Sequence, residues 1–350
     1  MFEVSIIIPV HNAKEQLARA IESAVNQKKV FTEVILVDDG STDGSAEICD
    51  DYAEQEPLLI KVIHQANKGT GAALNAGLDQ AIGKYVYFAD PNDYFDKNLL
   101  ADNCRLSKET RPDLIVFGYT QESTSNPQDR ELKLPNFPQL TTRQVFRQHF
   151  GNVYQFSPFV LWNKIYNKAF LNKHHIRFTN QPIGQDALFN IDVYKHASSV
   201  IVNRKAYYHN VLHECSPVDR YHPERYVMEQ KIAQAFEVLV KQWGEEPAFD
   251  DLIGEEYFRV IYLETGNLVH ESCPLDEDEK VARLRRLWQT IGTEKVLPFK
   301  ERDHNPFRQL LLNAYKQENF RRALFLMKGH NRLVNRYRRT HSLMNVFFNK

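Results

Sequence analysis

Polar and glycine residues follow four short apolar segments in the first hundred residues of this 350-residue chain. The loops are residues 9–12, 38–45, 67–71 and 90–93. They bring together carboxylates, a lysine and backbone amides next to glycines. A nucleotide requires this mixture: its base and ribose need hydrogen-bond partners, its phosphates need donors, and carboxylates can hold a divalent metal against a diphosphate. The loops therefore predict a nucleotide site.

The elements that must position these loops alternate between strands and helices. Apolar, β-branched runs predict strands at residues 4–8, 34–37, 61–64, 84–89 and 114–118. Helical spacing of apolar residues predicts helices at 13–27, 45–52 and 72–82. Because the strands are apolar throughout, we expect an α/β fold with a mostly parallel central sheet covered on both faces. Ligands of such sheets bind beyond the carboxyl ends of the strands, where the four loops lie.

The strand pattern stops at about residue 222. Five segments then have helical spacing: 225–243, 255–270, 277–291, 306–315 and 319–337. A chain of this length usually forms two domains, or one with an extension. We expect residues 1–218 to carry the site and residues 219–350 to form a separate helical domain, where contacts between subunits of a homo-oligomer are also expected.

Composition narrows the class of protein. With 43% hydrophobic and 25% charged residues, the chain is neither disordered nor a disulfide scaffold. No apolar run is long enough to span a membrane, and the first residues show no basic leader. The four cysteines are widely spaced and fit free thiols in a reducing compartment. We expect a cytoplasmic protein with no nucleic-acid partner.

The end of the chain is basic, because every charged residue after Glu318 is Lys or Arg. Within it, Phe320, Ala323, Leu324 and Met327 have the spacing of one helical face. Two interpretations stay open. The helix lies on the anionic inner face of the cell membrane, or the stripe packs on the helical domain and the charges are solvated.

Taken one at a time, the loops have other interpretations. Asp-Asp-Gly-Ser at 38–41 is a common turn that caps a helix. Gly69 and Gly71 nearly match the dinucleotide-binding fingerprint, with Asp90 nineteen residues beyond Gly71, which makes a dehydrogenase the rival. Leu74 stands in place of the third glycine, however, and the motif follows the third strand rather than the first.

Together the loops resemble glycosyltransferase family 2, whose members have the GT-A fold. The resemblance covers roughly residues 2–215 and rests on SIIIPVHN, VILVDDGSTDGS, NKGTGAALNAGLDQAIGKYVYFADPNDYF, FVLWNKIYNKAFLNKHHIRF, GQDALFNIDVYKHA and YYHNVLHECS. It implies an inverting hexosyl- or N-acetylhexosaminyltransferase that moves a sugar from a UDP-sugar to a hydroxyl of a saccharide, polymer or glycoprotein, in bacterial surface-glycan or cell-wall synthesis. The alternative is a catalytically silent member that binds or scaffolds, since Asn92 and Gln185 replace acids.

The resemblance also implies residue roles. Asp39 would contact the uracil ring, and the remaining nucleotide-sugar contacts would come from Pro9, His11, Asn12, Asp38, Lys68, Gly69, Asn75 and Asp90. A divalent metal, Mn²⁺ or Mg²⁺, would be held by Asp90, Asn92 and Asp93.

On the acceptor side, Asp186 matches the position of the family's catalytic base. Trp162 would stack on a sugar, with a core tryptophan as the alternative. His213 and Arg220 match the family's loop that closes over the diphosphate.

Overall fold

The computed structural model describes residues 2–123, 130–133, 140–155, 157–212, 220–244, 247–296 and 305–340. The chain divides into two compact units, Met1–Leu212 and His213–Lys350. Within the described ranges, no helix is both long enough and apolar enough to cross a bilayer.

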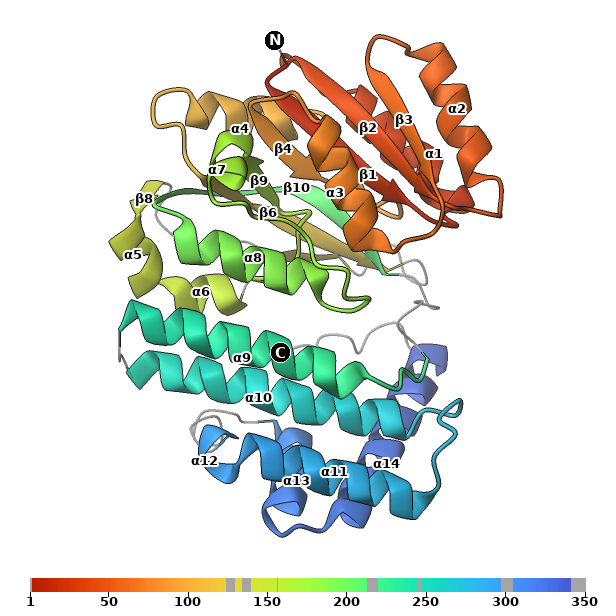
Figure 1. Cartoon of the computed structure of the whole chain (residues 1–350), viewed down its shortest axis with the longest axis vertical. Helices are drawn as coiled ribbons and strands as arrows, with labels where there is room; N and C mark the ends of the chain where they lie inside the picture. Colours follow the sequence, from red (N-terminus) through yellow and green to blue (C-terminus); the bar gives the residue numbers. More distant parts are fainter. Residues whose placement is uncertain are drawn as a thin grey trace. The chain divides into compact units, whose positions relative to one another are not determined.

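The first unit is built on one sheet (Figure 1). Its strand order is β3 (Ile60–Gln65), β2 (Thr32–Asp39), β1 (Val4–Val10), β4 (Tyr85–Phe88), β9 (Lys164–Asn167), β6 (Leu114–Ser123), β10 (Ser199–Leu212) and β5 (Tyr94–Phe95). Two further strands lie off this path: β7 (Arg130–Lys133) pairs with β6, and β8 (Leu140–Thr142) pairs with β10. The first four strands are parallel. Beyond them the sheet is mixed, because β9 runs antiparallel to both β4 and β6.

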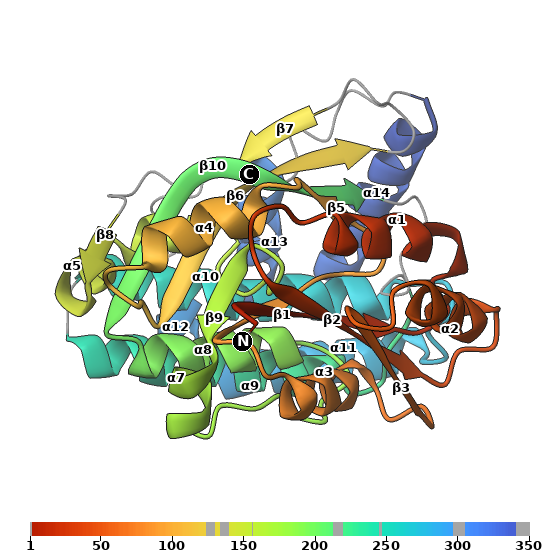
Figure 2. The same ribbon diagram turned by 90° about the horizontal axis from the view of Figure 1, so that it is seen from above.

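The parallel half follows directly from the sequence. Every residue of β2 is buried, as its apolar run predicts. The helices α1 (Lys14–Val25) and α2 (Ser45–Gln55) lie on one face of these strands, and α3 (Thr70–Gln80) lies on the other (Figure 2). Right-handed crossovers require this, because the strand order extends from β1 to β3 in one direction and then places β4 on the opposite side of β1.

A glycine lets α3 approach the sheet closely. A Cβ atom on Gly77 would lie 2.5 Å from Ile7 Cγ2, so a larger residue would push the helix away from β1. The strand order reverses between β1 and β4, which is where open sheets of this kind form their ligand crevice.

The sequence did not predict several elements of this unit. They are β5, β9, β10 and the helices α4 (Leu99–Ser107), α5 (Arg143–Gln148), α6 (Phe150–Gln155) and α7 (Lys168–Lys173). β9 is hidden because its four residues, KIYN, begin with a lysine. β10 is hidden because its register shifts between Asn203 and Tyr208, where its alternation is interrupted.

The second unit is helical, as expected. It contains α9 (Arg225–Trp243), α10 (Pro247–Leu268), α11 (Glu277–Ile291), α12 (Thr293–Val296), α13 (Pro306–Lys316) and α14 (Phe320–Thr340). Asp276 and Glu279 form a capping box at the start of α11. The fully buried Glu264 is bonded to Arg283 Nε at 2.6 Å, which ties α10 to α11.

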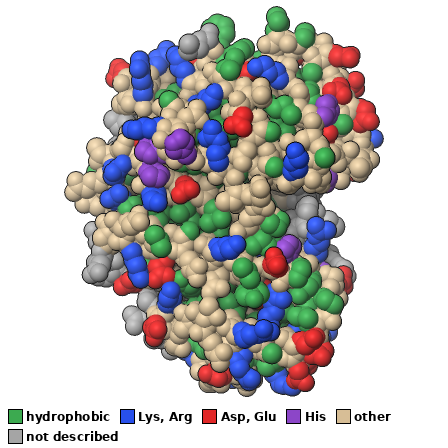
Figure 3. All heavy atoms as spheres, viewed as in Figure 1, with side chains coloured by type: hydrophobic (Ala, Val, Ile, Leu, Met, Phe, Trp, Pro, Cys, Tyr) green, Lys and Arg blue, Asp and Glu red, His purple; other side chains and the backbone are tan. Residues whose placement is uncertain are grey.

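The apolar stripe of α14 packs inside this unit. Phe320, Ala323, Leu324 and Met327 are all buried. Arg321 pairs with the acidic first turn of α11, at 2.6 Å from Glu277. Figure 3 shows acidic and basic side chains intermixed at the lower end of the molecule. The stripe is therefore a core feature and is not available to a membrane.

Candidate active site at the carboxyl ends of the strands

Asp39, the last residue of β2, organises the loop that follows β3. Its Oδ1 accepts hydrogen bonds from Gln65 Nε2 at 2.7 Å and from the Lys68 backbone amide at 2.8 Å. Its Oδ2 accepts one from the Gly69 amide at 2.8 Å. Gly69 has φ +89°, a conformation that favours glycine. Asp39 is only 3% exposed, and its carboxylate fixes the backbone at Lys68 and Gly69.

Exposed polar side chains surround Asp39. His11 Nδ1 lies 3.0 Å from the Asp39 carbonyl oxygen, and its Nε2 lies 3.3 Å from Asn67 Nδ2. The proton therefore belongs on Nδ1, which leaves Nε2 as an acceptor. Asn12, at φ 52°, accepts the Thr42 amide at 2.8 Å and so joins the loop after β1 to the loop after β2. Pro9, at the end of β1, is partly exposed.

Asp38 points to the opposite face of β2, as alternation along a strand requires. It accepts the Ser41 amide at 3.0 Å and lies 3.2 Å from His64 Nδ1, while His64 Nε2 lies 3.0 Å from Asp50. Burial tends to raise the pKa of Asp38, but these hydrogen bonds outweigh it and hold the pKa below its ordinary value. The hydrogen bonds to Asp50 and Asp38 raise the pKa of His64. The structure thus separates Asp38 from the group around Asp39.

Asn75 also serves the framework. Its side-chain amide exchanges two hydrogen bonds with the backbone of Phe178, at 2.9 and 3.0 Å. This ties α3 to the segment before α8 (Gln185–His196). Gly71 lies so close to that segment that a Cβ atom would be 2.3 Å from the Thr179 carbonyl oxygen. Lys68 differs from Asn75 in that its side chain is exposed.

The acidic loop after β4 splits into two parts. Asp90 Oδ1 accepts hydrogen bonds from both the backbone and the side-chain nitrogen of Asn92, each at 2.9 Å. Asp93 turns inward instead, accepting from Tyr208 Oη at 2.7 Å, Asn210 Nδ2 at 3.1 Å and the Val211 amide at 2.7 Å. Burial, with the negative charge of Asp90, raises the pKa of Asp93 to about 7. Its carboxyl group is thus hydrogen-bonded to three residues of β10.

The remaining two residues fit part of a metal site. Mg²⁺ is commonly held by one or two carboxylates together with substrate phosphates and water. Asp90 offers a carboxylate, and Asn92 offers an amide oxygen because its nitrogen is turned toward Asp90. Across the described ranges, no three His, Cys, Asp or Glu side chains form a metal site by themselves. A metal here would therefore depend on the diphosphate for further ligands.

The acceptor-side residues lie around α8 and the turn before β9. Asp186 is half-buried in the first turn of α8, after Gly184 at φ +74°. The Ala187 amide lies 2.8 Å from Asp186 Oδ1. Trp162 is also half-buried and stacks on Tyr208, with ring centroids 4.6 Å apart. Tyr208 in turn binds Asp93, so Trp162 is joined to the loop after β4.

The two residues expected in a closing loop are Arg220 and His213. Arg220 is exposed in the second unit. His213 lies outside the described residues.

Sequence reasoning also missed a residue. Lys164, on β9, is fully buried. The one sequence feature that could have indicated burial is its position, because it follows the apolar and aromatic run FVLW and Asn163.

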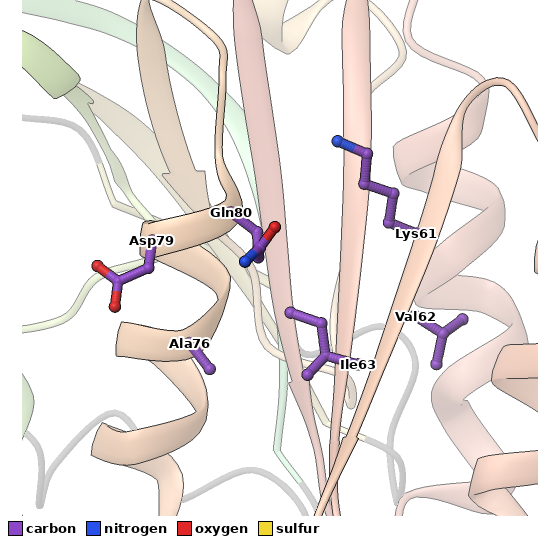
Figure 4. Close-up of a pocket in the computed structure, with 6 residues that line it drawn as sticks. All are labelled: Lys61, Val62, Ile63, Ala76, Asp79 and Gln80. Carbon is purple, nitrogen blue, oxygen red and sulfur yellow. The ribbon is translucent and has the colours of Figure 1, made fainter.

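A separate hollow lies beside the edge strand. It measures about 400 Å³ and is lined by Lys61, Val62, Ile63, Ala76, Asp79 and Gln80. Figure 4 shows these side chains coming from β3 on one side and α3 on the other. None of the expected site residues lines it, so it is distinct from the crevice at the carboxyl ends.

Comparison with known proteins gives consistent matches. The family model described as glycosyl transferase family 2 matches residues 5–206. The protein EpsH of Bacillus subtilis is 28% identical over 304 residues, which is 84% of this chain and 82% of that protein. A cholesterol galactosyltransferase of Borreliella burgdorferi is 32% identical over 217 residues, or 60% of each chain.

Solved structures extend the likeness to the fold. Staphylococcus aureus TarS residues 1–349, in complex with UDP-GlcNAc, superposes with a TM-score of 0.69 at 21% identity, covering 94% of this chain and 92% of that one. A mannosyltransferase of Pyrobaculum calidifontis in complex with GDP-Man and Mn²⁺ has a TM-score of 0.52 at 15% identity, covering 92% and 87%.

Proposed function

Because this chain belongs to glycosyltransferase family 2, we propose that it transfers a sugar from a UDP-sugar to a hydroxyl acceptor, with inversion at the anomeric carbon. The chain is a glycosyltransferase with a GT-A fold, as its sequence predicted, and the dehydrogenase interpretation is excluded. Its relatives include enzymes of glycan and cell-wall polymer synthesis. We assign the transfer to residues 1–218 and a separate role to the helical residues 219–350.

The donor proposal rests on the ring of polar groups around Asp39. Uracil presents an N3–H donor, and Asp39 Oδ2 accepts only one described hydrogen bond, which leaves lone-pair capacity for a second. His11, Asn12 and the exposed Lys68 surround this point from the loops after β1 and β3. The related TarS has been crystallised with UDP and with UDP-GlcNAc, which supports a uridine donor here.

The diphosphate would lie toward the loop after β4. Asp90 and Asn92 are the residues that would hold a divalent metal there. When bound, such an ion would neutralise the negative charge that develops on the departing UDP. Asp93 has no direct role in this proposal, because its carboxyl group is bonded to β10.

The acceptor chemistry is assigned to Asp186. An inverting transfer needs a base on the face of the sugar opposite the leaving group, since a hydroxyl is a poor nucleophile until its proton is removed. Asp39 and Asp90 are assigned to the nucleotide and the metal, and the carboxyl groups of Asp38 and Asp93 are held by hydrogen bonds within the framework. We assign the base to Asp186 because it matches the position of the family's catalytic base, and Trp162 offers an aromatic face for the acceptor.

The membrane and oligomer proposals concern the second unit. Since the α14 stripe is buried, we assign any contact with an anionic surface at the cytoplasmic face of the membrane to the charges of the basic tail rather than to that stripe. The helices of this unit remain the proposed place for contacts between copies of the chain.

A donor panel tests the proposed function. Purified protein is mixed with a set of UDP-sugars and Mn²⁺, and both UDP release and the shift in melting temperature are measured. We expect at least one UDP-sugar both to raise the melting temperature and to yield UDP. If no donor stabilises the protein or yields UDP, the proposal is refuted and a silent binding or scaffolding subunit is favoured.

The base is tested by replacing Asp186 with Asn. We expect kcat to fall by at least about 100-fold while UDP affinity stays within about twofold. Asp192, exposed on the same helix, provides the matched control, and Asp192→Asn should leave both quantities unchanged. Near-normal turnover in Asp186→Asn would show that the base lies elsewhere.

A further inference from the structure

Lys164 carries a charge into the interior of the first unit. Lysine is almost never fully buried without a partner, because desolvating an ammonium costs several kcal/mol. Here the side chain is 0% exposed, and its Nζ donates to Val160 O at 2.6 Å, Asn163 Oδ1 at 2.7 Å and Ser157 O at 3.3 Å. None of these three oxygens can donate in return. Three acceptors require three protons, so the charged ammonium is the form that fits.

Two side chains of α8 also bind the segment 157–160, to which Lys164 donates. Asn190 Nδ2 donates to Phe159 O at 2.8 Å, and the Tyr194 hydroxyl donates to Pro158 O. Asn190 is itself held by the Tyr166 hydroxyl, at 2.9 Å from its Oδ1. We call Lys164, Asn190 and Tyr194 the carbonyl clamp. Together they satisfy the four consecutive carbonyl oxygens of residues 157–160 with buried donors.

The clamped segment joins the two acceptor-side residues. Asn190 Nδ2 also donates to the carbonyl oxygen of Asp186 at 3.0 Å, one helical turn before it. At the other end, the segment continues to Trp162, whose carbonyl oxygen accepts the Tyr87 hydroxyl at 3.0 Å. The clamp thus connects the turn that carries Asp186 with the turn that carries Trp162.

We propose that the carbonyl clamp, and Lys164 above all, is a positioning device that holds Trp162 and the acceptor-side wall in a fixed relation to Asp186. The catalytic part of this inference rests on the proposed function, in which Asp186 is the base. A core that needed only packing would use an apolar residue in place of Lys164, since replacing buried charges by apolar groups is often neutral or stabilising. A buried ammonium instead specifies one arrangement of the carbonyl groups.

The charge of Lys164 has a second consequence. Burial lowers the pKa of Lys164, and the negative charge of Asp186 acts against this shift. Interaction between two charges is mutual, so the ammonium favours the ionised carboxylate that a base requires. Other titratable groups facing this region are Tyr166 on β9, Tyr194 on α8 and Tyr119 on β6, whose hydroxyl lies 2.7 Å from Ser157 Oγ. Burial raises the pKa of all three, which keeps them neutral.

Native-state proteolysis tests the clamp without relying on activity. Chymotrypsin cleaves after aromatic residues, and Phe159 and Trp162 lie in or next to the clamped segment. We expect Lys164→Met to raise cleavage at these two sites by at least about tenfold, as local opening becomes easier. Lys173→Met, on the exposed end of α7, is the control and should cleave like the wild type. Cleavage within β4 reports global unfolding and should not change.

Tyr194→Phe covers the case in which Lys164→Met does not fold. It removes one hydroxyl from the clamp and keeps the ring, so it should raise cleavage at Phe159 by a smaller factor. Unchanged cleavage at Phe159 and Trp162 in the folded variants would overturn the clamp.

Kinetics then separate positioning from mere stability. In Lys164→Met we expect kcat to fall by at least about tenfold with the KM for the UDP-sugar unchanged, and the acid limb of the pH–kcat profile to move to higher pH. Tyr194→Phe removes no charge, so its acid limb should stay in place. Normal kcat with an unmoved acid limb in Lys164→Met would show a purely structural lysine. A wild type that releases no UDP would refute the proposed function, while proteolysis would still decide the clamp.

Discussion

Replacing Asp39 with Asn tests the centre of the nucleotide site with one atom changed. The carboxylate accepts three hydrogen bonds, from Gln65 Nε2 and from the amides of Lys68 and Gly69. Asparagine keeps the shape but turns one oxygen into a donor. Whichever way its amide is oriented, at least one of these N–H groups then faces another N–H group. The free energy of unfolding should fall by about 1–3 kcal/mol, the cost of one unpaired buried donor.

The effect on nucleotide affinity should be of similar size and should depend on the base. If the uracil N3–H binds Asp39, the substitution removes a hydrogen bond to a charged group, worth about 1.5–3 kcal/mol. UDP affinity should then fall by roughly 10- to 150-fold. Cytosine presents an acceptor at N3, so the new donor should raise the affinity for CDP relative to that for UDP.

Asp38 is the matched control, because it is adjacent in sequence and points to the opposite face of β2. Asp38→Asn keeps an oxygen that can accept the Ser41 amide but loses the negative charge beside His64, so it should also reduce stability. UDP affinity should stay within about twofold, since the contacts of Asp38 lie apart from the base. Calorimetric titration with UDP and CDP, with urea unfolding of each variant, measures all of these quantities. Equal losses of UDP affinity in the two variants would refute the assignment of Asp39 to the base.

Three further outcomes follow from the same structure. If Asn92 binds the metal, Asn92→Asp should lower the Mn²⁺ concentration that gives half-maximal activity, because an added charge strengthens a hard-cation site, and an unchanged value would remove Asn92 from the ligands. The raised pKa of His64 means that its stabilising effect is complete below the unfolded pKa and is lost as pH rises through the folded pKa, so His64→Gln should cost more stability at pH 5.5 than at pH 8.5 in urea titrations. Phe320→Ala should destabilise the second unit by about 3–5 kcal/mol, whereas binding to anionic vesicles, if it depends on the tail's charges, should disappear in high salt and be unaffected by this substitution.

The sequence predicted the parallel half of the fold well because its evidence is local. The apolar runs of β1, β2, β3 and β4 each end in a polar loop, and the loop motifs are contiguous. The fold class and the family that these segments predicted are both confirmed by the comparisons.

What sequence could not predict is the direction in which neighbouring side chains turn. Asp38 and Asp39 look equivalent in a motif, but strand alternation sends them to opposite faces. Asp93 looks like a metal ligand, yet its partners come from β10, more than a hundred residues later. In the sequence, Lys164 looks like a surface residue. Its burial depends on carbonyl oxygens that accept its hydrogen bonds, and no sequence pattern reveals these.

The antiparallel strand β9 also affects the order in which the chain can fold. β4 has β1 on one side, and among the strands that the structure describes its other edge pairs with β9, which lies about 80 residues further along the chain. At synthesis rates of about 5–20 residues per second, this edge waits for roughly 4–16 seconds after β4 is made. An unpaired edge is a template for aggregation during that interval. A chaperone that covers the nascent sheet until Asn167 has been translated would therefore protect this protein at its most vulnerable stage.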